Sequence, residues 1–128
     1  MKLLRILLLV LLTICTTDKA AHAQTTLDKK QSTIVVTYAY IGCPSAQWAI
    51  NDRRMHTPER EHIFLEPAND KLPNADNMVD GSHIIKIKIT GRFYNEKGYP
   101  KKYHPTKGNP APARVFRYYK IVDISPPQ

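Results

Sequence analysis

One cysteine is the first residue of this chain whose side chain could carry chemistry. The chain has two cysteines and five histidines, and Cys43 stands between Gly42 and Pro44. A thiol with a histidine near it in space could act as a nucleophile or as a metal ligand. The available histidines, which show none of the spacings typical of metal sites, are His56, His62, His83 and His104. Three interpretations of Cys43 stay open: a small packed residue, a redox or metal-binding thiol, and a partner in an intermolecular disulfide.

Basic side chains alternate with isoleucines between residues 84 and 94. One parity holds Lys86, Lys88, Arg92 and Tyr94. The other parity holds Ile85, Ile87, Ile89, Gly91 and Phe93. A period of two predicts a strand with one face in the core and one basic face, which Arg117 extends if the last strand pairs beside it. Cations with interleaved rings suit single-stranded nucleic acid, sugar rings or an anionic peptide, although lysines on strands also guard against edge-to-edge aggregation.

A stretch rich in proline and glycine, from residue 95 to 113, carries further rings and charges. Connections of this length are often functional in compact domains. The residues that could contact a ligand there are Tyr99, Lys101, Lys102, Tyr103 and His104. Two interpretations stay open: these side chains form a recognition surface, or the tyrosines fold back and cover the mouth of the fold.

No sequence signal predicts an enzyme. The chain lacks a Gly-x-Ser-x-Gly elbow, a phosphate-binding loop and a zinc signature. The oxygen-bearing residues that could suit calcium, but lack the order of a calcium-binding loop, are Asp70, Asn74, Asp76 and Asp80. No pair of carboxylates has a spacing that implies an acid and a base. The sequence therefore predicts no catalytic residue, no bound metal and no cofactor.

Residues 1–23 predict export. Lys2 and Arg5 precede an apolar run over residues 6–15, and Ala21-His22-Ala23 follows, which is the order of a secretory signal peptide cleaved after Ala23. The apolar run is shorter than the roughly 20 residues that span a bilayer, so no membrane-spanning helix is predicted in the mature chain. Leu12-Thr13-Ile14-Cys15 also resembles a lipobox, in which Cys15 would carry a lipid. The expected location is periplasmic or extracellular or, with a lipidated Cys15, anchored at a membrane.

The charge of the chain favours anionic partners. The net charge is +8, and the mature chain stays basic after the signal peptide is removed. A basic exported protein suits nucleic acid, anionic lipid or acidic glycan, although the same charge also keeps a protein in solution. Because Cys43 is the only cysteine of the mature chain, we expect no internal disulfide.

Short strands must position these side chains. We expect strands over residues 32–41, 46–50, 62–66, 84–94 and 114–124, with a flexible arm over 24–31 and a tail over 125–128. Apolar residues on both parities of 114–124 predict a strand that is covered on both sides. The strands predict a single all-β domain over 32–124, a small OB-like barrel or sandwich of about four to six strands with little helix. Gly91, two residues before Phe93, suits a barrel corner where a strand coils sharply.

Part of this pattern resembles known proteins. The run Lys86-x-Lys88-Ile89-Thr90-Gly91-Arg92-Phe93 is similar to the central strand of OB-fold-like domains. A wider set resembles small uncharacterised exported proteins of Bacteroidetes-type bacteria, which are often lipoproteins. This set comprises Gly42-Cys43-Pro44-x-x-Gln47-Trp48, Leu65-Glu66-Pro67-Ala68-Asn69, Thr90-Gly91-Arg92-Phe93-Tyr94 and Ala113-Arg114-Val115-Phe116-Arg117-Tyr118. The resemblance implies an OB-like fold and export, and it implies no activity.

Together these features predict an exported, non-catalytic binding or interaction module. Its partner would be an anionic ligand, a glycan or an envelope protein, held by the basic strand face and the loop from Tyr99 to His104. One alternative is a thiol- or metal-dependent function centred on Cys43. Another is a structural protein of the envelope that binds no ligand.

Overall fold

The computed structural model describes residues 24–50, 60–81, 85–104, 108 and 110–125. The predicted signal peptide and the lipidation of Cys15 lie outside the described residues, as do His56, His83 and the last residues of the tail. Within the described parts of the chain, no helix is long and apolar enough to cross a membrane.

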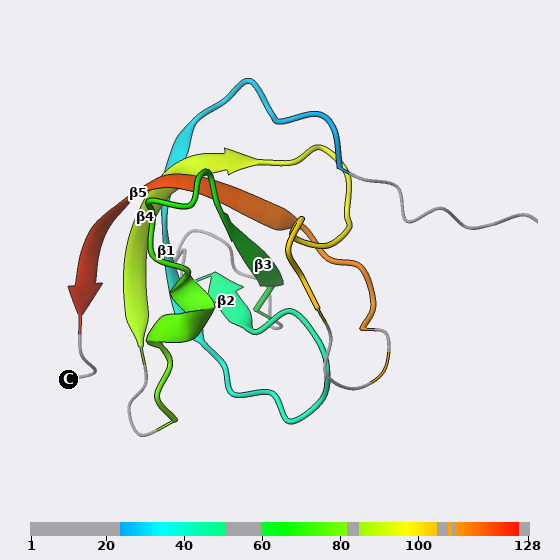
Figure 1. Cartoon of the computed structure of the whole chain (residues 1–128), viewed down its shortest axis with the longest axis vertical. Coiled ribbons are helices and arrows are strands. Elements are labelled where there is room, and N and C mark those ends of the chain that lie inside the picture. Colours follow the sequence, from blue (N-terminus) through cyan, green and yellow to red (C-terminus); the bar gives the residue numbers. More distant parts are fainter. Residues whose placement is uncertain (1–23, 51–59, 82–84, 105–107, 109, 126–128) are drawn as a thin grey trace, which may run out of the picture.

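Five strands and one 3-10 turn make up the described fold. The strands are β1 (Ser32–Tyr38), β2 (Trp48–Ile50), β3 (His62–Pro67), β4 (Lys86–Phe93) and β5 (Val115–Ser125), and the turn is η1 (Ala75–Met78). The strands close into a ring in the order β1-β2-β3-β5-β4 (Figure 1). This ring confirms the predicted all-β barrel with little helix.

One parallel strand pair closes the ring. β1 runs antiparallel to both β2 and β4, and the pairs β2–β3 and β4–β5 are also antiparallel. β3 and β5 run parallel, with Leu65 opposite Phe116. The sequence predicts either an OB-like barrel or a sandwich. A five-stranded mixed barrel with these connections matches the first of these alternatives.

Strand β4 follows the predicted alternation. Ile87 and Ile89 are fully buried, whereas Lys86 and Lys88 are exposed. Successive side chains of a strand point to opposite faces, and β-branched residues pack well on a pleated surface. The isoleucines therefore build the core, and the lysines project outward from the same strand.

Gly91 lets β4 approach β5 closely. A Cβ atom built at Gly91 would lie 2.7 Å from Cα of Tyr118, which no real side chain tolerates. The register between the two strands shifts between Thr90 and Gly91. A bulge together with a missing side chain increases the local bend of a strand, which confirms the predicted corner.

Strand β5 is not buried on both faces along its whole length, although its sequence pattern predicts this. Its first residues, Val115 and Phe116, are fully buried, but Tyr119, Val122 and Ile124 are exposed. Two register shifts against β4 leave one extra residue each in β5, and each extra residue changes the face that the following side chains occupy. Both faces of β5 are therefore buried only at its start. In the rest of the strand, the two bulges explain why apolar residues occur at both parities.

The described fold has two hydrophobic clusters, one on each face of the sheet. The larger one fills the barrel and includes Trp48, Ile63 and Phe116. The smaller one contains Phe64 and Val115, which alternate with Ile63 and Phe116 along β3 and β5 and so lie on the outer face. Tyrosines of the 95–113 stretch pack against this outer cluster.

The predicted flexible arm is bound to the barrel over part of its length. The backbone N–H of Asp28 donates to the carbonyl of Phe93 at 2.8 Å, and the N–H of Asn95 donates to the carbonyl of Thr26 at 2.9 Å. The side chain of Gln24 is buried, and its Nε2 donates to the carbonyl of Glu96 at 2.9 Å. These bonds extend the sheet beyond the end of β4, so residues 24–28 belong to the fold.

Candidate functional site

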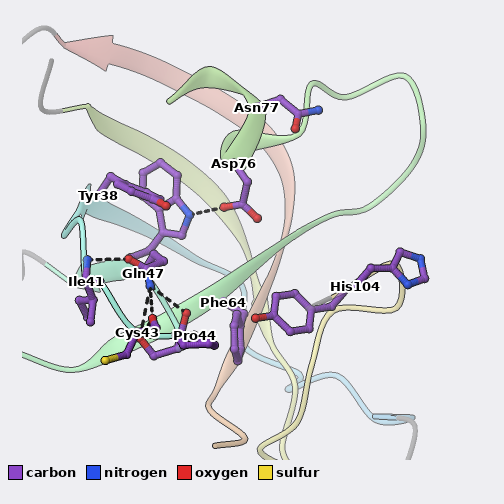
Figure 2. Close-up of a pocket in the computed structure, with 13 residues that line it drawn as sticks. Tyr38, Ile41, Cys43, Pro44, Gln47, Phe64, Asp76, Asn77 and His104 are labelled. Carbon is purple, nitrogen blue, oxygen red and sulfur yellow. Dashed lines mark hydrogen bonds between the residues drawn. The ribbon is translucent and has the colours of Figure 1, made fainter. Parts of the chain in front are cut away.

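An open pocket of about 630 Å³ lies where the β1–β2 connection meets β3, η1 and the stretch after β4 (Figure 2). The β1–β2 connection contributes Ile41, Gly42, Cys43, Pro44, Ser45 and Gln47. The strands contribute Tyr38, Trp48 and Phe64, and the remaining lining residues are Asp76, Asn77, Tyr103 and His104. Its volume lies within the usual range of small-molecule sites.

Gln47 gives the β1–β2 connection its shape. Its Oε1 accepts a 2.7 Å hydrogen bond from the backbone N–H of Ile41, and its Nε2 donates to the carbonyls of Cys43 and Ser45, both at 3.2 Å. A short side chain in this position could not reach both ends of the turn. The amide of Gln47 therefore replaces regular secondary structure as the support for this wall of the pocket.

Trp48 and Asp76 join the barrel to η1. The indole Nε1 of Trp48 donates a 2.7 Å hydrogen bond to Oδ1 of Asp76. Burial raises the pKa of Asp76, and the hydrogen bond from Trp48 opposes that shift in part. The local fold of η1 begins at Asn74, whose side chain accepts from the backbone N–H of Asp76.

Tyr118 fixes η1 from inside the barrel. Its hydroxyl accepts a 3.0 Å hydrogen bond from the N–H of Ala75 and donates a 2.6 Å hydrogen bond to the carbonyl of Pro73. Burial, the largest cause, raises the pKa of Tyr118 to about 12. The buried phenol therefore stays protonated and holds Asp76 at the pocket.

Aromatic rings form two sides of the pocket. On one side Tyr38 packs edge-on against Trp48, with ring centroids 5.2 Å apart. On the other side Phe64 lies 5.0 Å from Tyr103, which stacks on Tyr99 at 5.8 Å. Burial, with the charge of Asp76 as the next cause, raises the pKa values of Tyr38 and Tyr103. A tyrosine therefore stands on each aromatic side of the pocket.

A buried carboxylate anchors the turn that carries Tyr103. Glu66 is buried in β3, its Oε2 accepts a 2.9 Å hydrogen bond from the backbone N–H of Lys101, and its Oε1 accepts a 2.6 Å hydrogen bond from the hydroxyl of Tyr94. The Nε of Arg117 lies 3.9 Å from the same carboxylate. Glu66 thus connects β3, β4 and β5 to the turn at the edge of the pocket.

Three of the sequence-predicted candidates meet at this pocket. Cys43 is exposed, and it lines the pocket together with Tyr103 and His104. In Figure 2 the ring of His104 points away from the other side chains. Tyr99 lies behind Tyr103, and its hydroxyl donates to the carbonyl of Pro110 at 2.6 Å. The tyrosines of the 95–113 stretch therefore pack on the outer face of the sheet instead of covering the mouth of the barrel, and Tyr103 also lines the pocket.

The basic candidates lie elsewhere. Lys86 and Lys88 are exposed on the outer face of β4, and neither lines the pocket. Lys101 is exposed, and the Nζ of Lys102 pairs with Asp70 on the surface.

The remaining strand candidates lie outside the pocket, and two of them, Tyr94 and Arg117, lie beside Glu66. Arg92 is directly opposite Arg117 in the β4–β5 register, and the Nη2 of Arg117 donates to the carbonyl of Ala68 at 2.8 Å. Tyr94 is buried. The residues predicted to bind one ligand thus lie in three different places. Lys86 and Lys88 are exposed on β4, Tyr94 and Arg117 lie beside the buried Glu66, and Tyr103 and His104 line the pocket.

Sequence reasoning did not find most of the pocket. The sequence does not single out Trp48 or Phe64. It places Asp76 only among oxygen-bearing residues that lack the order of a calcium-binding loop. The one available signal was that Trp48 is the single tryptophan of the chain. Within the described residues, no group of three or more histidine, cysteine, aspartate or glutamate side chains could hold a metal ion.

Comparison with known proteins adds no further assignment. No family model, no curated protein and no solved structure matches this chain.

Proposed function

We propose that this protein is an exported, non-catalytic binding module whose ligand occupies the pocket between residues 41–47 and 103–104. One observation carries this proposal: the pocket has walls that other parts of the fold hold in place. Gln47 shapes one wall, and Glu66 anchors the other through the N–H of Lys101. A site with fixed walls loses little conformational entropy when a ligand binds.

The lining supports a ligand that is partly apolar. Phe64, Tyr38 and Tyr103 offer ring carbons, and Asp76 and Asn77 offer polar atoms. Small-molecule pockets commonly combine apolar and aromatic walls with a few polar groups that fix orientation. A sugar ring or a small organic molecule meets this description better than an extended strand of nucleic acid, which needs a basic groove.

The fold offers a direct test of this proposal. Because Trp48 is the single tryptophan and lines the pocket, its fluorescence reports binding there. Tyr103→Ala should remove one aromatic side of the pocket and weaken, by about tenfold or more, the binding of any ligand found in a screen of sugars and small organic molecules. The matched control is Tyr119→Ala, because Tyr119 is exposed and does not line the pocket; this variant should bind normally. Equal ligand affinity of the two variants would place the site elsewhere.

A thiol-dependent function is the second candidate, because Cys43 is exposed and lines the same pocket. The two candidates make opposite predictions for the Cys43→Ser variant. Unchanged ligand affinity supports the non-catalytic binding module, whereas loss of binding or of a redox reaction supports a role for the thiol.

A further inference from the structure

The described lining of the pocket contains an acidic side chain, although the chain as a whole is basic. The chain has a net charge of +8, and among the lining residues that the structure describes there is no lysine and no arginine. Asp76 is the carboxylate and His104 the histidine among these described lining residues, and the ring of His104 points away from Asp76 (Figure 2). The nearest lysine in sequence to Tyr103, Lys102, pairs with Asp70. The pocket therefore presents an acidic group without a lysine or an arginine among its described lining residues.

Aromatic rings line the same pocket as that acidic group. Trp48 holds Oδ1 of Asp76 at 2.7 Å, and Tyr38 packs against Trp48. The ring of Tyr103 lines the facing side of the same pocket. Cations are attracted by the faces of aromatic rings and by carboxylates, and both attractions strengthen when water is partly excluded. An anion would meet the charge of Asp76 without a lysine or an arginine from the described part of the pocket wall.

We propose that the pocket binds a small organic cation, whose ammonium group pairs with Asp76 while its carbon atoms pack against Tyr38, Phe64 and Tyr103. This inference rests on the proposed function, because it names the chemical class of the ligand for the same pocket. It differs from the anionic ligand that net charge predicts. The volume of about 630 Å³ suits a small molecule.

A pair of probes that differ only in charge tests the proposal. Choline carries a trimethylammonium group, and 3,3-dimethylbutan-1-ol has the same shape without the charge. Titration of each into the protein, followed by Trp48 fluorescence, should show choline binding at least about tenfold more tightly. Added salt should weaken choline binding and leave the neutral alcohol unaffected.

Asp76→Asn isolates the charge of the acidic group. The amide oxygen of asparagine can still accept the hydrogen bond from Trp48, so the fold of the pocket is kept. The variant should lose the preference for choline and bind both probes equally. Glu96→Gln is the matched control, because Glu96 is exposed, lies outside the pocket and carries the same charge; it should keep the preference.

The outcomes separate this inference from the proposed function. Equal binding of choline and the alcohol to the unchanged protein, with both weakened by Tyr103→Ala, would overturn the cation proposal and keep the binding module. A preference for choline that survives Asp76→Asn would also overturn it. If other ligands bind and Tyr103→Ala does not weaken their binding, the pocket itself is not the site and both proposals fail.

Discussion

The hydroxyl of Tyr94 donates a 2.6 Å hydrogen bond to Oε1 of the buried Glu66. This bond links the end of β4 to the middle of the barrel wall. The other oxygen of Glu66 accepts from the N–H of Lys101, so one carboxylate supports both the sheet and the turn beside the pocket. Buried carboxylates are stabilising only when hydrogen bonds and charges compensate their loss of water.

Glu66→Gln should destabilise the fold. Glutamine keeps the volume but removes the negative charge opposite Arg117, and its amide cannot satisfy the same set of donors. We expect a loss of roughly 2–3 kcal/mol in the free energy of unfolding, measured by urea denaturation. Asp70→Asn breaks the pair with Lys102, whose side chains are 86% and 80% exposed, and should change stability by less than about 1 kcal/mol. Equal effects of the two substitutions would contradict the role of Glu66.

Gly91→Ala should prevent close packing of β4 on β5. Its methyl group would clash with the backbone of Arg117 and Tyr118, and backbone atoms of a paired strand cannot move aside without breaking the barrel. We expect a loss of about 3 kcal/mol or more, or failure to fold. Gly42→Ala is the control, because a Cβ at Gly42 meets nothing within 4 Å. A stable, native-like Gly91→Ala protein would show that the corner does not need glycine.

The barrel should lose stability in alkali. Burial, the largest cause, raises the pKa values of Tyr94 and Tyr118 from 10.0 to about 12. Between these values the folded state holds protons that the unfolded state releases, so stability falls as the pH rises from about 10 to 12. Each tyrosine should contribute roughly 2–3 kcal/mol to this fall. Absorbance at 295 nm should show that two of the seven tyrosines ionise only as the protein unfolds, and Tyr94→Phe should remove one of them.

Asp76 should make stability depend on pH in the acidic range. Burial raises its pKa in the folded state above the ordinary value of 3.8. The folded state therefore holds the proton more tightly, and the stability that this group contributes is lost as the pH rises from 3.8 through the raised pKa. The difference in unfolding free energy between the wild-type protein and Asp76→Asn should shrink over that interval and then stay constant. Urea denaturation at several pH values measures it, and a difference that grows with pH would contradict the assignment.

The strands were predictable because their signals are local. The alternation around Ile87 and Lys88 requires only neighbouring residues, and Gly91 marks a close approach whichever strand lies opposite. The bulges in β5 were not predictable in the same way, because its mixed pattern also suits a strand with cover on both faces. Register depends on the partner strand, which the pattern of one strand does not identify.

The pocket was predictable only in part, because its members are distant in sequence. Cys43 and Tyr103 stood out as a lone thiol and as a ring in a long loop. Asp76 lies 28 residues after Trp48 in the sequence. The 3-10 turn that places it beside Trp48 has no apolar periodicity that could have been recognised. Glu66 also resembled an ordinary strand carboxylate, and only its contact with the N–H of Lys101 shows what it supports.

The parallel pairing of β3 with β5 has a consequence for how the chain matures. The barrel cannot close until the last strand has been synthesised, and contacts such as Arg114 with Glu61 join residues 53 positions apart. Chains rich in such distant contacts fold slowly, on the order of milliseconds to seconds. A nascent chain that ends before Val115 exposes the inner isoleucines of its unfinished wall, so chaperones have time to engage it before the ring forms.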